Sequence, residues 1–157
     1  MSEHQELSYK TQISEESSPK EYCTWQEIEV LIEKLVRTMR RSGKKYDVVL
    51  AITNGGIIPA RLIARELDVN HIQFILLRNK KLYAQDMVPL LKGRKYLIAD
   101  DIYDTGNTFN KVSAMVKEFD CDFAFLMSRY KNSNASLVAK VLNHEKWIVF
   151  PWEEKRY

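Results

Sequence analysis

One stretch of the chain, from Tyr96 to Thr108, constrains the fold more than any other. A short apolar run there ends in two adjacent acids, Asp100 and Asp101, and a third acid, Asp104, opens the sequence Asp-Thr-Gly-Asn-Thr. This pattern predicts a buried strand, a loop and the start of a helix. Carboxylates at a strand end can hold a sugar diol or a metal ion, and the free N–H groups of a helix N-terminus can hold a phosphate. The stretch therefore predicts a site for a sugar phosphate.

The size and charge of the chain narrow the class of protein. A length of 157 residues indicates one domain, and we expect a polar tail over residues 1–20 followed by a single domain over residues 21–157. The apolar runs are shorter than a membrane span requires, and the N-terminus shows no apolar signal, so we expect a cytoplasmic protein. The net charge of +3 does not single out nucleic acid as a partner and suits a small anionic ligand.

The apolar pattern alternates between helical and strand-like spacing. Helices are expected from Thr24 to about Gly43, from near Pro59 to about Leu67, from near Thr108 to Phe119, and from Ala135 to Leu142. Strands are expected over residues 47–52, 72–77, 95–99, 123–127 and 147–150. Alternation of this kind predicts an α/β fold with a mostly parallel central sheet flanked by helices. Ligands of such sheets bind outside the carboxyl ends of the strands, where the acids after residue 99 fall.

A second loop also follows a predicted strand. It reads Thr53, Asn54, Gly55, Gly56. Two glycines at this place allow a ligand to approach the backbone closely, although a tight turn without a ligand explains the same pair of residues.

The least regular segment, Arg78 to Gly93, is long for a loop inside a compact domain, which favours a functional or mobile role. A lid over an anionic ligand needs cations and an aromatic ring, which Lys80, Lys81 and Tyr83 supply. An exposed hairpin is the alternative. We call residues 78–93 the lid segment.

Other nucleotide-binding signatures are missing from the sequence. It contains neither the Gly-rich loop with Lys-Ser/Thr nor the dinucleotide fingerprint Gly-x-Gly-x-x-Gly. His4, His71 and His144 are scattered singly, and we expect no ligand role for any of them.

The stretch from Leu97 to Thr108 resembles the phosphoribosyl-pyrophosphate motif of the type I phosphoribosyltransferases. That motif is an apolar triplet, two acids, an apolar residue, any residue, Asp-Thr-Gly, any residue and Thr, and every defined position matches. The segment from Ala51 to Ala60 resembles the pyrophosphate loop of the same family. The resemblance covers about Tyr46 to Glu153 and implies the type I fold, with a mobile lid and a small C-terminal segment that binds the base.

The segment from Trp147 to Glu153 resembles the base-binding segment of small microbial xanthine-guanine and hypoxanthine-guanine phosphoribosyltransferases. This implies that the Trp147 ring stacks on a purine, that the backbone at Ile148 reads its edge, and that Glu153 closes the segment. By the same resemblance Arg129, or else Lys131, contacts the exocyclic oxygen of a 6-oxopurine.

The resemblance also assigns roles to the two loops. Asp100 and Asp101 are expected to bind the ribose hydroxyls, directly or through Mg²⁺, and Asp104 is expected to act as general base. The 5′-phosphate is assigned to Thr105, Gly106, Asn107 and Thr108, and the pyrophosphate to Thr53, Asn54, Gly55 and Gly56. One departure concerns Asn54, where related bacterial enzymes often carry an arginine, so a lid lysine has to supply the charge or pyrophosphate binds more weakly.

The implied reaction is transfer of a 5-phosphoribosyl group to hypoxanthine, guanine or xanthine, as in purine salvage. The partners expected are the small-molecule substrates, Mg²⁺ and a second copy of the chain in a homodimer, without nucleic acid or membrane. Two alternatives stay open: a regulator that binds phosphoribosyl pyrophosphate without catalysis, and a phosphoribosyltransferase for another base.

Overall fold

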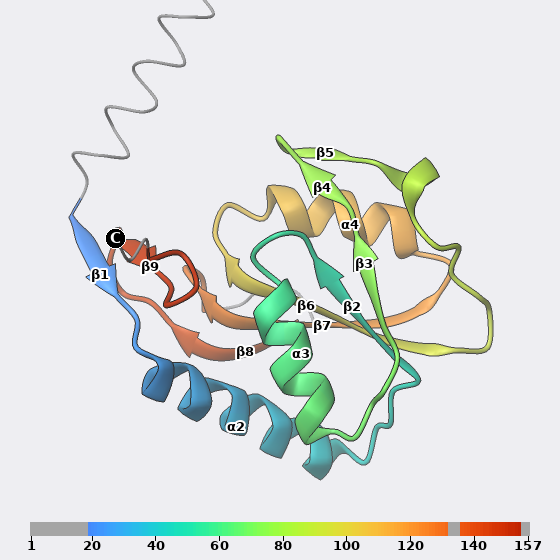
Figure 1. The fold of residues 1–157 in the computed structure, drawn as a ribbon, viewed down its shortest axis with the longest axis horizontal. Coiled ribbons are helices and arrows are strands. Elements are labelled where there is room, and N and C mark those ends of the chain that lie inside the picture. Colours follow the sequence, from blue (N-terminus) through green and yellow to red (C-terminus); the bar gives the residue numbers. More distant parts are fainter. Residues whose placement is uncertain (1–18, 132–135, 155–157) are drawn as a thin grey trace, which may run out of the picture.

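The computed structural model describes residues 19–131 and 136–154, and Figure 1 shows their arrangement. The helices are α2 (Trp25–Ser42), α3 (Ile57–Glu66) and α4 (Asn107–Val116), with a short 3-10 helix η1 (Ala84–Asp86). The strands are β1 (Lys20–Tyr22), β2 (Val48–Ile52), β3 (Ile72–Ile75), β4 (Leu77–Arg78), β5 (Lys81–Leu82), β6 (Lys95–Tyr103), β7 (Asp120–Ser128), β8 (Ser136–Val141) and β9 (Trp147–Val149). Five of them form one parallel sheet in the order β3-β2-β6-β7-β8. The expected α/β fold with a mostly parallel sheet is confirmed.

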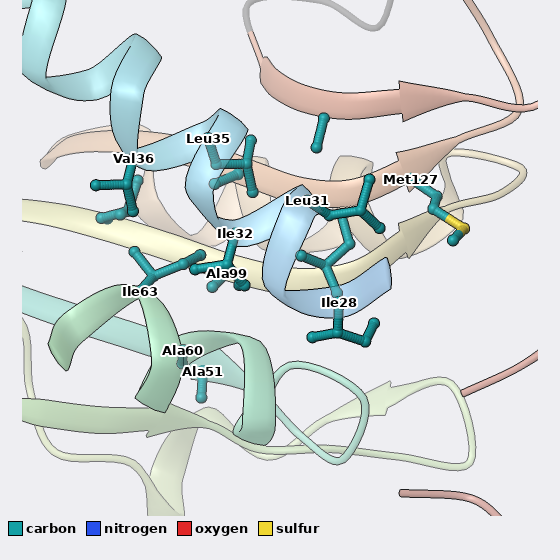
Figure 2. Close-up of a cluster of buried hydrophobic side chains, with 14 of the residues drawn as sticks. Ile28, Leu31, Ile32, Leu35, Val36, Ala51, Ala60, Ile63, Ala99 and Met127 are labelled. Carbon is teal, nitrogen blue, oxygen red and sulfur yellow. The ribbon is translucent and has the colours of Figure 1, made fainter. Parts of the chain in front are cut away.

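Helices cover both faces of this sheet. On one face α2 and α3 pack together over the strands, and Figure 2 shows Ile32 and Leu35 of α2 close to Ile63 of α3 and Ala99 of β6. On the other face α4 buries Val112 and Val116 against the strands. In residues 19–131 and 136–154, no helix has the length and apolar character needed to cross a membrane.

The first helix begins and ends as its sequence predicts. The Thr24 hydroxyl accepts the N–H of Glu27 at 3.1 Å, and the Glu27 carboxylate accepts the N–H of Thr24 at 2.8 Å, which completes a capping box. At the other end Gly43 takes a left-handed conformation with φ 71° and donates its N–H to the Arg40 carbonyl. Both ends are therefore fixed by local chemistry.

Replacing Thr24 by alanine is expected to lower the free energy of unfolding by about 1 kcal/mol, because the N–H of Glu27 loses its acceptor. Urea unfolding followed by circular dichroism measures the change. The matched control is Thr38→Ala within the same helix, where the hydroxyl only bonds back to the Lys34 carbonyl. Equal stability of Thr24→Ala and the wild type would contradict a role for the cap.

The predicted helix over residues 135–142 is wrong, because Ser136–Val141 forms β8. This strand lies parallel to β7 at the edge of the sheet, with Phe125 opposite Val138 and Met127 opposite Lys140. The segment contains two β-branched valines and buries Ala139 while Lys140 is exposed, a pattern that suits a half-buried edge strand. The available sheet edge decided the conformation.

The strand that carries the acids is longer than expected. It was predicted to end at Ala99 but continues to Tyr103, and on the β7 side Asp100 lies opposite Phe125 and Tyr103 opposite Ser128. On the β2 side the pairing stops at Ala99. Asp100 and Asp101 therefore lie within β6 and past its last residue pair with β2.

Two smaller sheets complete the fold. β9 pairs with β1 rather than with the central sheet, with Trp147 opposite Lys20 and Ile148 opposite Glu21. The lid segment begins with a short antiparallel hairpin of β4 and β5, as its hairpin alternative described. Lys20 was predicted to belong to the polar tail and here lies in β1, whereas residues 1–18 of that tail and residue 135 of the predicted last helix lie outside the described residues.

Candidate active site at the carboxyl ends of β2 and β6

The loop after β2 lies directly against β6. A Cβ atom added to Gly55 would meet Asp101 Oδ2 at 2.4 Å, and one added to Gly56 would meet the Ala99 carbonyl oxygen at 2.2 Å. These positions accept only glycine, because any side chain would collide with the carboxylate or with the backbone of β6. The structure thus brings Gly55 and Gly56 close to Asp101 and to the backbone at Ala99. Asn54, in the same loop, is exposed to solvent.

Thr53 points toward the lid segment. Its hydroxyl accepts the N–H of Leu77 at 3.0 Å and lies 3.2 Å from the Leu77 carbonyl oxygen. The side chain therefore ties the loop to the start of the hairpin, and only the backbone of Thr53 is left for the expected pyrophosphate contact.

Of the two adjacent carboxylates, Asp100 is buried and Asp101 is partly buried. Asp100 Oδ1 accepts the N–H of Asp101 at 2.9 Å, and Asp101 Oδ1 accepts the N–H of Ile102 at 2.7 Å. Burial, and then the charge of Asp101, raise the pKa of Asp100 well above its ordinary value, and burial also raises the pKa of Asp101. Charged side chains held in this way favour an added cation.

Glu153 comes close to the same pair. Burial raises the pKa of its carboxyl, and the charge of Asp101 raises it further. Among the described residues no three acid, histidine or cysteine side chains converge to form a metal site alone. Hard oxygen donors of this type fit Mg²⁺, which usually keeps several waters and takes oxygens from its substrate.

The loop from Asp104 to Thr108 forms the start of α4. Gly106 adopts φ 90°, and a Cβ atom there would lie 2.7 Å from the Tyr103 hydroxyl. A small hollow of about 50 Å³ lies at the helix start, lined by Ile102, Tyr103, Asp104, Thr105, Gly106, Asn107, Thr108, Phe109 and Phe125. Backbone donors at a helix start suit an anion.

The hairpin of the lid segment faces this loop. A second hollow, of about 240 Å³, is lined by Leu77, Lys80, Asp104, Thr105, Asn107, Thr108 and Lys111. Lys111 Nζ donates to the Lys80 carbonyl oxygen and so joins α4 to the hairpin. Lys111 is not among the predicted site residues, although its place three residues after Thr108 puts it on the same side of the helix.

The three lid candidates are not equivalent. Lys80 lines the hollow, whereas the Tyr83 ring lies under the Arg78 guanidinium at 4.4 Å and near Lys81 Nζ at 5.6 Å. Lys81 and Tyr83 therefore hold the hairpin together in this conformation, and Lys80 is the one that reaches the loop.

Arg129 joins the loop that begins at Asp104 to the turn before the C-terminal segment. Its Nε–H donates to Asp104 Oδ1 at 3.1 Å, while Nη1 donates to the His144 carbonyl at 2.8 Å and Nη2 to the Lys146 carbonyl at 2.9 Å. The Arg129 side chain is 10% exposed and that of Asp104 is 54% exposed. Three of the five N–H bonds of the guanidinium are thus engaged, and Asp104 stays accessible to a ligand.

The C-terminal segment from Trp147 to Glu153 directly follows Lys146 in the chain. The Trp147 side chain is 42% exposed, whereas Ile148 is buried and anchors β9. The rings of Phe150 and Trp152 stack at 4.8 Å, which fixes the turn that leads to Glu153. Trp147 is the next residue after Lys146, whose carbonyl accepts the Arg129 Nη2 N–H.

A larger hollow of about 740 Å³ lies between α2 and α3, but none of the predicted site residues lines it. The carboxyl end of β6 carries the acids, the loop from Asp104 to Thr108 follows it, and the glycine loop after β2 lies against it, so we locate the candidate active site there.

Comparisons with known proteins show the family to which the chain belongs. A family model described as phosphoribosyl transferase domain matches residues 18–157. The xanthine-guanine phosphoribosyltransferase from Chromohalobacter salexigens is 33% identical over 118 residues, which are 70% of each chain. The one from Nitratidesulfovibrio vulgaris is 28% identical over 138 residues, which are 84% of this chain and 83% of the relative. The purine phosphoribosyltransferase from Pyrococcus horikoshii is 28% identical and superposes with a TM-score of 0.68 over 88% of this chain and 96% of its own. The Helicobacter pylori xanthine-guanine-hypoxanthine phosphoribosyltransferase shares the fold, with a TM-score of 0.73 at 18% identity over 85% and 93% of the two chains. The chain belongs to the phosphoribosyl transferase family.

Proposed function

We propose that the protein transfers the 5-phosphoribosyl group of phosphoribosyl pyrophosphate to a 6-oxopurine base, giving a nucleoside monophosphate and pyrophosphate. The observation that carries this proposal is the ion pair between Asp104 and Arg129. It links the loop at the start of α4 to the turn before Trp147, which supports a sugar-phosphate site next to a site for the base. The relatives named for xanthine-guanine transfer support the choice of base.

Each group at the site has a task in this reaction. The N–H groups of the loop from Thr105 to Thr108 bind the 5′-phosphate, and Asp100 and Asp101 hold the ribose hydroxyls. The accessible Asp104 carboxylate accepts the N–H proton of the base as its nitrogen attacks the sugar carbon. The bond from that carbon to pyrophosphate breaks at the same time, and the loop from Thr53 to Gly56 receives the leaving group.

Mg²⁺ is proposed as the cofactor, held by Asp100 and Asp101, and when bound it neutralises charge on the departing pyrophosphate. The raised pKa values of these two buried carboxyls support a cation at this position. Lys80 and Lys111 are proposed to add the positive charge that Asn54 does not bring. The homodimer and the cytoplasmic location stay predictions.

A regulator without catalysis is the second candidate, and the uncharged, exposed Asn54 is the observation that favours it. Both are tested by mixing the protein with phosphoribosyl pyrophosphate, Mg²⁺ and hypoxanthine, guanine or xanthine, then separating the products. The enzyme forms the monophosphate and pyrophosphate, and chelation of Mg²⁺ abolishes the product. Tight binding of phosphoribosyl pyrophosphate in calorimetry without product from any base would support the regulator.

Replacing Trp147 by alanine is expected to raise the KM for the base by roughly 10-fold to 100-fold, because stacking on an aromatic ring contributes about 1–3 kcal/mol per base. Steady-state assays at saturating phosphoribosyl pyrophosphate measure the change. The control Trp147→Phe keeps an aromatic face and should stay within a few-fold of the wild type. A KM for the base that is unaffected in Trp147→Ala would exclude stacking by this ring.

A further inference from the structure

A single histidine holds the turn from which Arg129 takes its two carbonyl partners. His144 Nδ1 lies 3.1 Å from the Lys146 nitrogen, and that amide is the donor. His144 Nε2 lies 3.1 Å from Glu21 Oε2 in β1. Since an amide can only donate to Nδ1, the ring proton lies on Nε2 and is donated to Glu21. Both ring nitrogens are therefore used, one within the turn and one toward the N-terminal strand.

The carbonyls of this turn set the orientation of Arg129. They belong to His144 and Lys146, the two residues that the Nδ1 contact joins. A guanidinium as buried as that of Arg129 depends on all of its acceptors, because a buried cation without partners is costly. If the turn relaxes, Arg129 loses two acceptors and its Nε–H no longer meets Asp104 in the same place. The contacts thus run from Glu21 through His144 and Arg129 to Asp104.

We propose that His144 is a positioning residue for the transfer reaction, which rests on the proposed function. It fixes the turn over residues 144–146 so that Arg129 presents Asp104 to the substrate and keeps its remaining N–H groups toward the base. The contact that matters is the one from the Lys146 N–H to Nδ1, and the contact with Glu21 secures β1 against the turn. His144 does not touch the reacting atoms.

Two substitutions separate the roles of the two ring nitrogens. Asparagine places an oxygen near the position of Nδ1 and readily accepts an N–H two residues ahead, as in an Asx turn. Glutamine extends toward the position of Nε2 and can meet Glu21 but does not close the turn. We expect His144→Gln and His144→Ala to lower kcat by roughly 10-fold to 100-fold with an unchanged KM for phosphoribosyl pyrophosphate. His144→Asn should restore kcat to within a few-fold of the wild type.

A second measurement does not depend on activity. With ¹⁵N-labelled arginine, the Nε–H resonance of Arg129 is identified by its loss in Arg129→Lys. It should persist in His144→Asn and be lost by exchange in His144→Gln. If the wild type forms no product from any base but this pattern holds, the proposed function fails and the positioning of Arg129 by His144 stands. Wild-type kcat in His144→Gln, or an Arg129 resonance that is equally preserved in both variants, would overturn the inference.

Discussion

Replacing Asp104 by asparagine is expected to lower kcat by about 100-fold to 10,000-fold, the usual contribution of a positioned general base. The amide oxygen of asparagine can still accept the Arg129 Nε–H that now bonds to Asp104 Oδ1 at 3.1 Å, so the local structure is kept. Only the capacity to take a proton is removed. The KM values for both substrates should therefore change by no more than a few-fold, and steady-state kinetics with each purine base give both parameters.

The matched control for this substitution is Asp120→Asn. Asp120 is exposed and begins β7, at the amino end of the sheet and away from the site, so its kcat should equal that of the wild type. A kcat of Asp104→Asn within a few-fold of the wild type would remove Asp104 as the general base. A large increase in KM with an unchanged kcat would instead assign it to binding.

Replacing Asp100 by asparagine is expected to stabilise the fold and to abolish most of the activity. Asp100 is 9% exposed, and its pKa is raised by burial and by the charge of Asp101, so keeping it ionised at neutral pH costs folding free energy. Asparagine removes that charge and retains an oxygen to accept the N–H of Asp101. We expect the free energy of unfolding at pH 7 to increase by about 0.5–2 kcal/mol, the range of single stabilising changes at functional sites.

The pH dependence follows from the sign of this shift. A carboxyl with a raised pKa binds its proton more tightly in the folded chain, so its favourable contribution is full below the ordinary carboxyl pKa of about 4. That contribution is lost as the pH rises through the raised pKa of the folded state. Asp100→Asn should therefore exceed the wild type in stability at pH 7 and match it near pH 4, with urea unfolding as the measurement.

The control is again Asp120→Asn, an identical chemical change at an exposed position, which should leave the free energy of unfolding unchanged at both pH values. Lower stability of Asp100→Asn at pH 7 would mean that its charge stabilises the fold. The loss of activity in Asp100→Asn tests whether Asp100 binds a ligand, because a residue that lowers the stability of the free protein is expected to be kept for its function.

Local sequence patterns correctly predicted the elements whose stabilising contacts are between residues close together in the chain. The capping box of Thr24 and Glu27 predicted the start of α2, and Gly43 its end. The run that ends in Asp100 and Asp101 predicted a buried strand followed by a loop and a helix start, which the structure confirms in β6 and α4. In each case short-range sterics and hydrogen bonding decide the conformation, whatever the rest of the chain does.

Local sequence patterns could not predict the contacts between segments that are distant in the chain. The segment at residues 136–141 has no strong local preference, and it became β8 because β7 offered an unpaired edge. The pairing of Trp147 with Lys20 put β9 in a two-stranded sheet with β1 and not in the central sheet. No periodicity within either segment encodes its partner, since pairing depends on which backbone groups elsewhere are free.

The sequence by itself determined the family motif, with its acids from Asp100 to Asp104 and the helix start that follows, because these residues are adjacent in the chain. Only the tertiary structure decided that Arg129 meets Asp104, that Glu153 approaches Asp101, and that His144 joins Glu21 to the turn beneath Arg129. The hydrogen bond between Arg129 and Asp104 joins residues 25 positions apart in the chain, and the one between His144 and Glu21 joins residues 123 positions apart. Long-range packing alone brings such groups into contact, and an isolated histidine in a sequence carries no sign of it.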